Sequence, residues 1–146
     1  MWVELRDQGF DPYTELMRHQ TETLGQSGQF GATCSFVGTM RDFNEGDRVS
    51  SMLLEYYPGM TEKYLDRILE EARRQWGFLD ALIIHRVGEV FPNDPIVLVA
   101  VWSSHRAVAF DSCRSILEEL KSRAPFWKKE TMEEGTRWVE KNTAGV

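Results

Sequence analysis

Alternating apolar and polar positions divide the first part of the chain into a helix and two strands. Asp11, which is followed by proline, predicts a helix start, because aspartate accepts hydrogen bonds from free backbone amides and proline suits the first turn. We expect this helix to run to about Thr23. Residues 30–37 (FGATCSFV) are rich in β-branched and aromatic side chains and predict a strand. Residues 42–50 (DFNEGDRVS) predict an exposed loop, after which residues 51–57 form a second strand.

The second part of the chain returns to helical spacing and then repeats the pattern. Apolar residues recur at helical intervals up to Gly77, at Leu65, Ile68, Leu69, Ala72 and Trp76. Residues 81–87 and 96–103 predict two more strands, and the second is apolar enough to be central in a sheet. A last amphipathic helix starts near His105 and must end before Pro125.

The expected order of elements is β-α-β-β-α-β-β-α followed by a tail, with the first strand ahead of the helix that starts at Asp11. Strands joined by short loops favour antiparallel pairing, and three helices can cover one face of the sheet or flank its ends. With 146 residues and 16.9 kDa, the chain fits a single domain over residues 1–146. Apolar residues make up 42% and charged residues 27%, which is typical of a packed globular core. We therefore expect an α+β fold with a mostly antiparallel sheet.

Simple counts exclude several classes of protein. The longest apolar run, from Ile96 to Trp102, has 7 residues, whereas a membrane span needs about 20. The amino-terminal residues carry charge and lack the pattern of a signal peptide, so we expect a cytoplasmic protein. Cys34 and Cys113 lie in apolar segments, which favours reduced core thiols. The three histidines show no metal-ligand spacing, so neither a metal nor another cofactor is expected.

The charge is distributed unevenly along the chain. The net charge is −6, yet residues 121–129 (KSRAPFWKK) hold four basic residues and no acidic one, which leaves 13 basic and 23 acidic residues elsewhere. Nucleic acid needs a broad basic surface, so we expect no nucleic-acid partner. A compact pocket for a small anion fits this segment better, and a solvated basic run on the surface is the alternative.

Basic residues follow the ends of predicted elements, where rigid scaffolds carry functional groups. Arg41 follows the strand at residues 30–37, and His105 and Arg106 follow the strand at residues 96–103. A helix amino terminus offers free N–H groups, and Arg106 can add a bidentate contact to phosphate. The alternative is that Ser104 caps the helix and Arg106 pairs with a nearby carboxylate.

Two lysines flank the break at Pro125. Lys121 closes the last predicted helix and Lys128 lies beyond it, so the two side chains meet only if the chain turns back. If they converge near Arg41 and Arg106, mutual repulsion lowers the pKa of a lysine and suits it to proton transfer. Two solvated lysines are the alternative.

Paired aromatic residues accompany the basic ones. Phe126 and Trp127 lie between the lysines, where they can stack on a planar ring or pack into the core. Tyr56, Tyr57 and Trp138 fit packing or a subunit contact. The number of tryptophans in the composition favours a subunit contact, and packing in the core is the alternative.

These residues lie in segments that resemble the large, catalytic subunit of molybdopterin synthase, between Gly31 and Glu140. Five ordered segments carry the resemblance: residues 36–41 (FVGTMR) with Asn44, 54–60 (LEYYPGM), 84–88 (IHRVG), 103–106 (SSHR) with Ala109 and Phe110, and 120–130 (LKSRAPFWKKE). The first 28 residues resemble the family weakly.

The resemblance implies a fold, a reaction and partners. The fold is of the α/β hammerhead type, and the reaction converts cyclic pyranopterin monophosphate into molybdopterin by adding two sulfurs as a dithiolene. The sulfur comes from a small ubiquitin-like subunit whose C-terminal Gly-Gly tail ends as a thiocarboxylate. The family forms a homodimer of large subunits with a small subunit at each end, a heterotetramer.

The resemblance also implies a substrate pocket. By position, its residues are Thr39, Met40, Arg41, His105, Arg106, Lys121, Lys128, Lys129 and Glu130. We assign Arg41, His105 and Arg106 to the phosphate and the pterin, Lys121 to the thiocarboxylate and the acyl intermediate, and Lys128 to proton transfer.

Two other functions compete with this one. One is a noncatalytic module that binds an anion or a peptide tail on the same fold, and retention of both lysines argues against it. The other is a single-stranded nucleic-acid binder that stacks bases on Phe126 and Trp127, which the acidic net charge disfavours.

Overall fold

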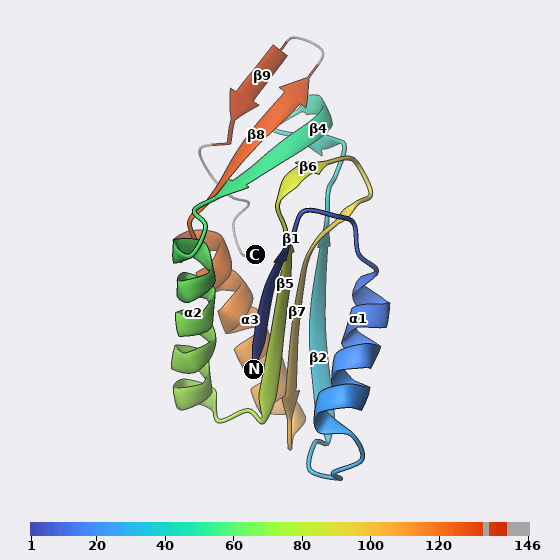
Figure 1. Cartoon of the computed structure of the whole chain (residues 1–146), viewed down its shortest axis with the longest axis vertical. Helices are drawn as coiled ribbons and strands as arrows, with labels where there is room; N and C mark the ends of the chain where they lie inside the picture. Colours follow the sequence, from blue (N-terminus) through green and yellow to red (C-terminus); the bar gives the residue numbers. More distant parts are fainter. Residues whose placement is uncertain (133–134, 140–146) are drawn as a thin grey trace.

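The computed structural model describes residues 1–132 and 135–139, so Glu140, where the resemblance ends, lies outside the described residues. A four-stranded sheet runs through the body of the molecule in the order β1-β5-β7-β2 (Figure 1). Its strands are β1 (Trp2–Arg6), β5 (Asp80–Arg86), β7 (Pro95–Ser103) and β2 (Ala32–Thr39). β7 pairs antiparallel with both β5 and β2, which confirms its predicted central place, and β1 joins the edge in parallel with β5.

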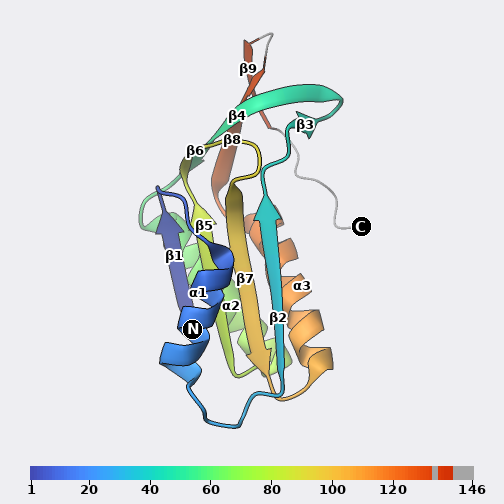
Figure 2. The same ribbon diagram turned by 90° about the vertical axis from the view of Figure 1, so that its right-hand side faces the viewer.

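Helices lie on both faces of this sheet, which differs from the expected arrangement on one face or at the ends. α2 (Met60–Trp76) and α3 (Arg106–Arg123) cover one face, and α1 (Pro12–His19), with the π-helical turn η1 (Gln20–Leu24), covers the other (Figures 1 and 2). β5 and β7 bury side chains on both faces because each face has its own helical cover. No helix in the described ranges has the length and apolar character needed to cross a membrane.

The predicted helix boundaries follow from local chemistry. The Asp11 carboxylate accepts hydrogen bonds from the backbone N–H groups of Tyr13 and Thr14, as expected for a capping residue before proline. Gly77 ends α2 with a φ of 70°, a left-handed conformation that glycine adopts at little cost. These two boundaries confirm the sequence prediction.

Two hydrophobic clusters fill the space between the sheet and its helices. α2 and α3 pack on β5 and β7 through Leu69, Ile83, Val99 and Ile116, which are almost fully buried. On the opposite face, Trp102 packs under the α1 side and donates a hydrogen bond to Gln20 at 3.0 Å. Cys34 and Cys113 are free thiols, and Cys113 is buried, as expected for core cysteines.

A second sheet continues beyond the end of the first and differs most from the prediction. Its strands are β3 (Phe43–Asn44), β4 (Asp47–Tyr56), β8 (Phe126–Met132) and β9 (Gly135–Trp138) in that order, and β6 (Gly88–Val90) also pairs with β4. The expected loop at residues 42–50 is therefore a β-hairpin and the start of a long strand. Within the described part of the expected tail, residues 126–132 and 135–138 form two strands.

The composition of β8 explains why the sequence pattern does not predict this strand. Its sequence, FWKKETM, carries three charged residues and reads as a solvated segment, yet it pairs with β4 from Val49 to Tyr56. Successive strand residues point to opposite faces. Lys128 and Glu130 therefore lie on the inner face of the β4-β8-β9 ribbon, and Trp127 and Lys129 lie on the outer face.

Candidate functional site

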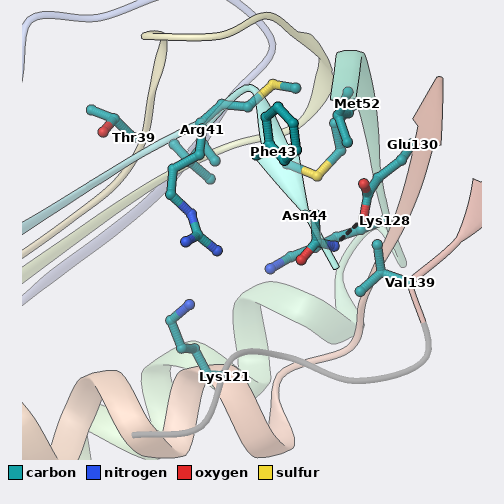
Figure 3. Close-up of a pocket in the computed structure, with 12 residues that line it drawn as sticks. Thr39, Arg41, Phe43, Asn44, Met52, Lys121, Lys128, Glu130 and Val139 are labelled. Atoms are coloured by element: carbon teal, nitrogen blue, oxygen red, sulfur yellow. Dashed lines mark hydrogen bonds between the residues drawn. The ribbon is translucent and has the colours of Figure 1, made fainter. Parts of the chain in front are cut away.

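A cavity lies where the two sheets meet, between the end of β2, the β3-β4 hairpin, the end of α3 and the inner face of β8 (Figure 3). The turn after β2 contributes Arg41, α3 contributes Lys121 and β8 contributes Lys128. These side chains point toward one another into a common space. The cavity also contains three more of the predicted residues, Thr39, Met40 and Glu130.

The charges in this cavity change the properties of Lys128. Burial and, to a lesser extent, the positive charge of Lys121 lower the pKa of Lys128 to about 8, and Glu130 opposes the shift. Repulsion between the two lysines was expected, but the structure makes desolvation the larger cause. Near neutral pH, a small change in pH therefore changes the fraction of Lys128 side chains that carry a proton.

Glu130 gives the cavity one fixed carboxylate. Its side chain is 2% exposed, and Oε1 accepts a hydrogen bond from Asn44 Nδ2 at 2.5 Å. Arg137 Nη2 lies 3.6 Å from Oε2, and Arg137 also pairs with Asp47 at 2.8 Å. Glu130 thus ties the β3-β4 hairpin to β8 and β9 and places Asn44 at the cavity wall.

A more apolar chamber adjoins the cationic cavity and shares Lys121 and Lys128 with it. Its other walls are Phe36, Gly38, Thr39, His85, Ile96, Val97, Leu120, Ala124, Phe126, Trp127 and Val139. The two lysines therefore line both spaces, and the second space has more apolar side chains in its walls. Two chemically different groups could meet there.

His85 is a residue of this chamber that sequence analysis did not assign to the site. Its ring stacks on Phe126 with centroids 4.0 Å apart, and Nδ1 donates to the carbonyl of Arg86 at 2.6 Å. Burial is the main cause that lowers the pKa of His85 to about 4; the hydrogen bond to the Arg86 carbonyl opposes the shift, and the charges of Lys128 and Lys121 add to it. The ring is neutral at pH 7, and Nε2 remains an acceptor. Sequence analysis considered His85 only as a possible metal ligand, although residues 84–88 belong to the segments that carry the family resemblance.

Three predicted residues do not join the cavity in one copy of the chain. His105 and Arg106 start α3, whereas Lys121 lies 15 residues further along it, about 22 Å away at the rise of an α-helix. Lys129 lies on the outer face, with Nζ 5.5 Å from the ring centre of Trp138. The predicted convergence of Arg106 with Arg41, Lys121 and Lys128 is therefore wrong within one chain.

The start of α3 also differs from the alternative weighed for it. His105 is the N-cap residue and provides no side-chain cap, while Ser103 Oγ donates to the His105 carbonyl at 2.5 Å. Arg106 is exposed and forms no ion pair within the described part of the chain. Among residues 1–132 and 135–139, no group of three His, Cys, Asp or Glu side chains is placed to hold a metal.

Comparison with known proteins shows which family the chain resembles. The family model described as "MoaE protein" matches residues 9–123. A Ralstonia nicotianae protein named molybdopterin synthase catalytic subunit is 57% identical over 112 residues, which are 77% of this chain and 64% of that protein. A Pseudomonas aeruginosa protein of the same name is 47% identical over 140 residues, 96% of this chain and 91% of that one.

Solved structures agree with the sequence matches. The molybdopterin biosynthesis MoaE protein from Burkholderia ambifaria superposes with a TM-score of 0.80 at 43% identity, over 98% of this chain and 92% of that chain. Molybdopterin synthase from Staphylococcus aureus superposes with a TM-score of 0.77 at 28% identity, over 93% and 95% of the two chains. The α+β fold and the resemblance are confirmed, and the chain belongs to the MoaE family of molybdopterin synthase catalytic subunits.

Proposed function

We propose that this chain is the sulfur-transferring subunit that converts cyclic pyranopterin monophosphate into molybdopterin. The observation that carries the proposal is the meeting of Arg41, Lys121 and Lys128, from three separate elements, in one cavity of an acidic protein. The substrate phosphate and a donor thiocarboxylate are both anions. A site that holds them together needs several fixed cations in a partly desolvated space.

The two lysines have different tasks in this proposal. Lys121, between the polar cavity and the apolar chamber, neutralises the thiocarboxylate and then the acyl group linked to the substrate. Lys128, whose pKa lies at about 8, exchanges a proton as the cyclic phosphate opens and the carbon–sulfur bond forms. Arg41 binds the phosphate through its guanidinium group, and Thr39, Met40 and Glu130 complete the walls.

The donor is a second protein, a small ubiquitin-like subunit with a C-terminal Gly-Gly thiocarboxylate. The relatives are named as one subunit of a synthase, and neither Cys34 nor Cys113 lines the cavity as a sulfur carrier. Glycine residues need little width, so such a tail fits the apolar chamber. The free thiols also fit a cytoplasmic location.

His105 and Arg106 can serve the reaction only from a second copy of the chain. They are exposed, and one α3 helix holds them about 22 Å from its own Lys121. In a symmetric homodimer each copy gives the same surface to the other. We therefore place the His105-Arg106 pair of one copy beside the substrate phosphate of the other, within a heterotetramer.

Reconstitution tests the proposal. The protein is mixed with a thiocarboxylated small subunit and the cyclic monophosphate, and dithiolene formation is followed by mass spectrometry. We expect two sulfurs to be added per substrate. Binding of the tail without product, under conditions where a Pseudomonas aeruginosa relative turns over, would favour a noncatalytic tail-binding module.

A further inference from the structure

The outer face of the β4-β8-β9 ribbon carries a group of aromatic side chains that the reaction does not use. Tyr57, Trp127 and Trp138 are 54%, 42% and 50% exposed. Together with Glu55 and Tyr56 they line a shallow surface cavity. We call these five residues the aromatic cage.

Strand alternation explains why the cage and the catalytic cavity lie on opposite sides of β8. Trp127 lies opposite Glu55 of β4, and its neighbour Lys128 points to the catalytic side. Trp138 of β9 lies opposite Lys129, on the same outer face as Trp127. The ribbon extends beyond the end of the four-stranded sheet, so the outer face has no helical cover (Figure 1).

The cage has the geometry and charge of a site for an organic cation. Tyr57 and Trp127 stand edge to face, with centroids 4.9 Å apart and planes at 74°. Aromatic faces attract ammonium and guanidinium groups, and Lys129 Nζ already lies 5.5 Å from the ring centre of Trp138. The exposed Glu55 carboxylate forms no ion pair with any residue the structure describes. It is therefore available to a cation that enters between the rings.

The position of Trp127 indicates which molecule supplies the cation. Trp127 lines both the cage and the apolar chamber beside Lys121 and Lys128. A protein that delivers its tail into that chamber has its body close to the cage. Glu55 places a carboxylate in the wall of the cage, so a basic side chain of the incoming protein is attracted there.

We propose that the aromatic cage binds a lysine or arginine side chain of the small sulfur-carrier subunit and so holds that subunit while its tail occupies the chamber. The inference rests on the proposed function for the identity of this partner. Tryptophan, tyrosine and arginine dominate binding energy at protein interfaces, because they bury large areas and keep a polar end. The cage contributes to affinity and does not contact the reacting atoms.

Affinity measurements with the cognate small subunit, in its C-terminal carboxylate form, test the inference. Isothermal titration calorimetry compares the unmodified chain with Glu55→Gln and Tyr57→Leu. We expect each variant to raise Kd by about tenfold and to leave turnover at saturating small subunit within twofold. The effect of Glu55→Gln should shrink as salt is added, because exposed charges are screened.

A matched control separates this contact from a general change of charge. Glu70 is an exposed carboxylate on α2, so Glu70→Gln removes the same charge away from the cage and should leave Kd unchanged. Glu55 is also exposed, and circular dichroism checks that both variants stay folded. An unchanged Kd for Glu55→Gln and Tyr57→Leu overturns the inference.

Two further outcomes have distinct meanings. If sedimentation shows that the cage variants weaken self-association while affinity for the small subunit is unchanged, the cage contacts a second copy and the inference is wrong. If the unmodified chain binds the small subunit through the cage but forms no dithiolene, the inference stands and the proposed function fails.

Discussion

Lys121 is the side chain on which the proposed chemistry depends most. It lies at the end of α3, lines both chambers and is half-buried. We expect Lys121→Ala to lose most of the turnover, because no other described cation lines both chambers except Lys128. The free energy of unfolding should change by less than about 1 kcal/mol, since the residue is outside the hydrophobic core.

The control for this variant is Lys63→Ala, which removes an exposed lysine from α2. Dithiolene formation and thermal unfolding are measured for both variants. Normal turnover of Lys121→Ala would remove Lys121 from the mechanism.

The lowered pKa of Lys128 leads to a prediction about how turnover depends on pH. Its pKa lies at about 8, below the ordinary value of 10.5, so the side chain loses its charge as pH rises through 8. We expect turnover to change with an inflection near pH 8. In Lys128→Arg the inflection should disappear, because arginine stays protonated. Titration of the Lys128 side chain by ¹³C NMR measures the same pKa directly, and a value near 10.5 would contradict the desolvated cavity.

The lowered pKa of His85 makes the stability of the folded chain depend on pH in the acid range. Its folded pKa of about 4 lies below the ordinary 6.5, so between these values the unfolded chain binds a proton that the folded chain does not. Stability is fully present above pH 6.5 and falls as pH decreases toward 4, by at most about 3 kcal/mol. His85→Phe keeps a ring against Phe126 and should flatten this part of the profile. Denaturant unfolding at several pH values checks the slope.

At the scale of elements, the connection between β7 and α3 depends on one small residue. A Cβ at Gly31 would lie 2.5 Å from the carbonyl oxygen of Ser104, and the Gly31 N–H donates to the Ser103 carbonyl at 2.9 Å. We expect Gly31→Ala to destabilise the protein by about 1–3 kcal/mol, because backbone must shift to relieve the contact.

Gly28→Ala is not a suitable comparison, since Gly28 has a φ of 73° and strains any other residue. Ala32→Gly at the start of β2 tests backbone flexibility without adding a contact. If Gly31→Ala unfolds at the same temperature as the wild type, the packing around Ser104 is looser than the structure shows.

The elements that sequence patterns predicted are those whose burial follows a simple period. α2 buries one stripe, and β7 is apolar throughout because both faces are covered. β8 was missed because its inner face lines a cationic cavity and its outer face carries exposed aromatics, so neither face has the composition of a core. Likewise, the polar hairpin of β3 is stabilised by Glu130 and Arg137, about 90 residues away in the chain.

The site was predictable to the extent that its residues are cations at the ends of elements. Arg41, Lys121 and Lys128 were found that way, and the structure brings them together. His85 was not, because its neutral state depends on burial, which sequence does not give directly. Arg106 is held away from Lys121 by the length of α3, which the spacing of basic residues does not show.

At the scale of the whole molecule, the length of α3 leads to the proposal that each active site is built from two copies of the chain. Lys121→Ala should lose most of the turnover, and Arg106→Ala should mainly weaken binding of the cyclic monophosphate, which lowers turnover when that substrate is limiting. In a homodimer of either variant, both sites are damaged. In the proposed arrangement the two residues of a site come from different copies, so one site of a mixed dimer receives the intact Arg106 and the intact Lys121.

Mixing the two impaired variants therefore restores activity if the subunits exchange. Random pairing gives half mixed dimers with one good site each, so about a quarter of wild-type turnover is expected. The control is a chain that carries both substitutions, mixed with wild type in the same ratio, which should leave each mixed dimer with two damaged sites. No recovery after verified exchange would place Arg106 outside the catalytic site and leave the phosphate to Arg41 and the lysines of a single copy.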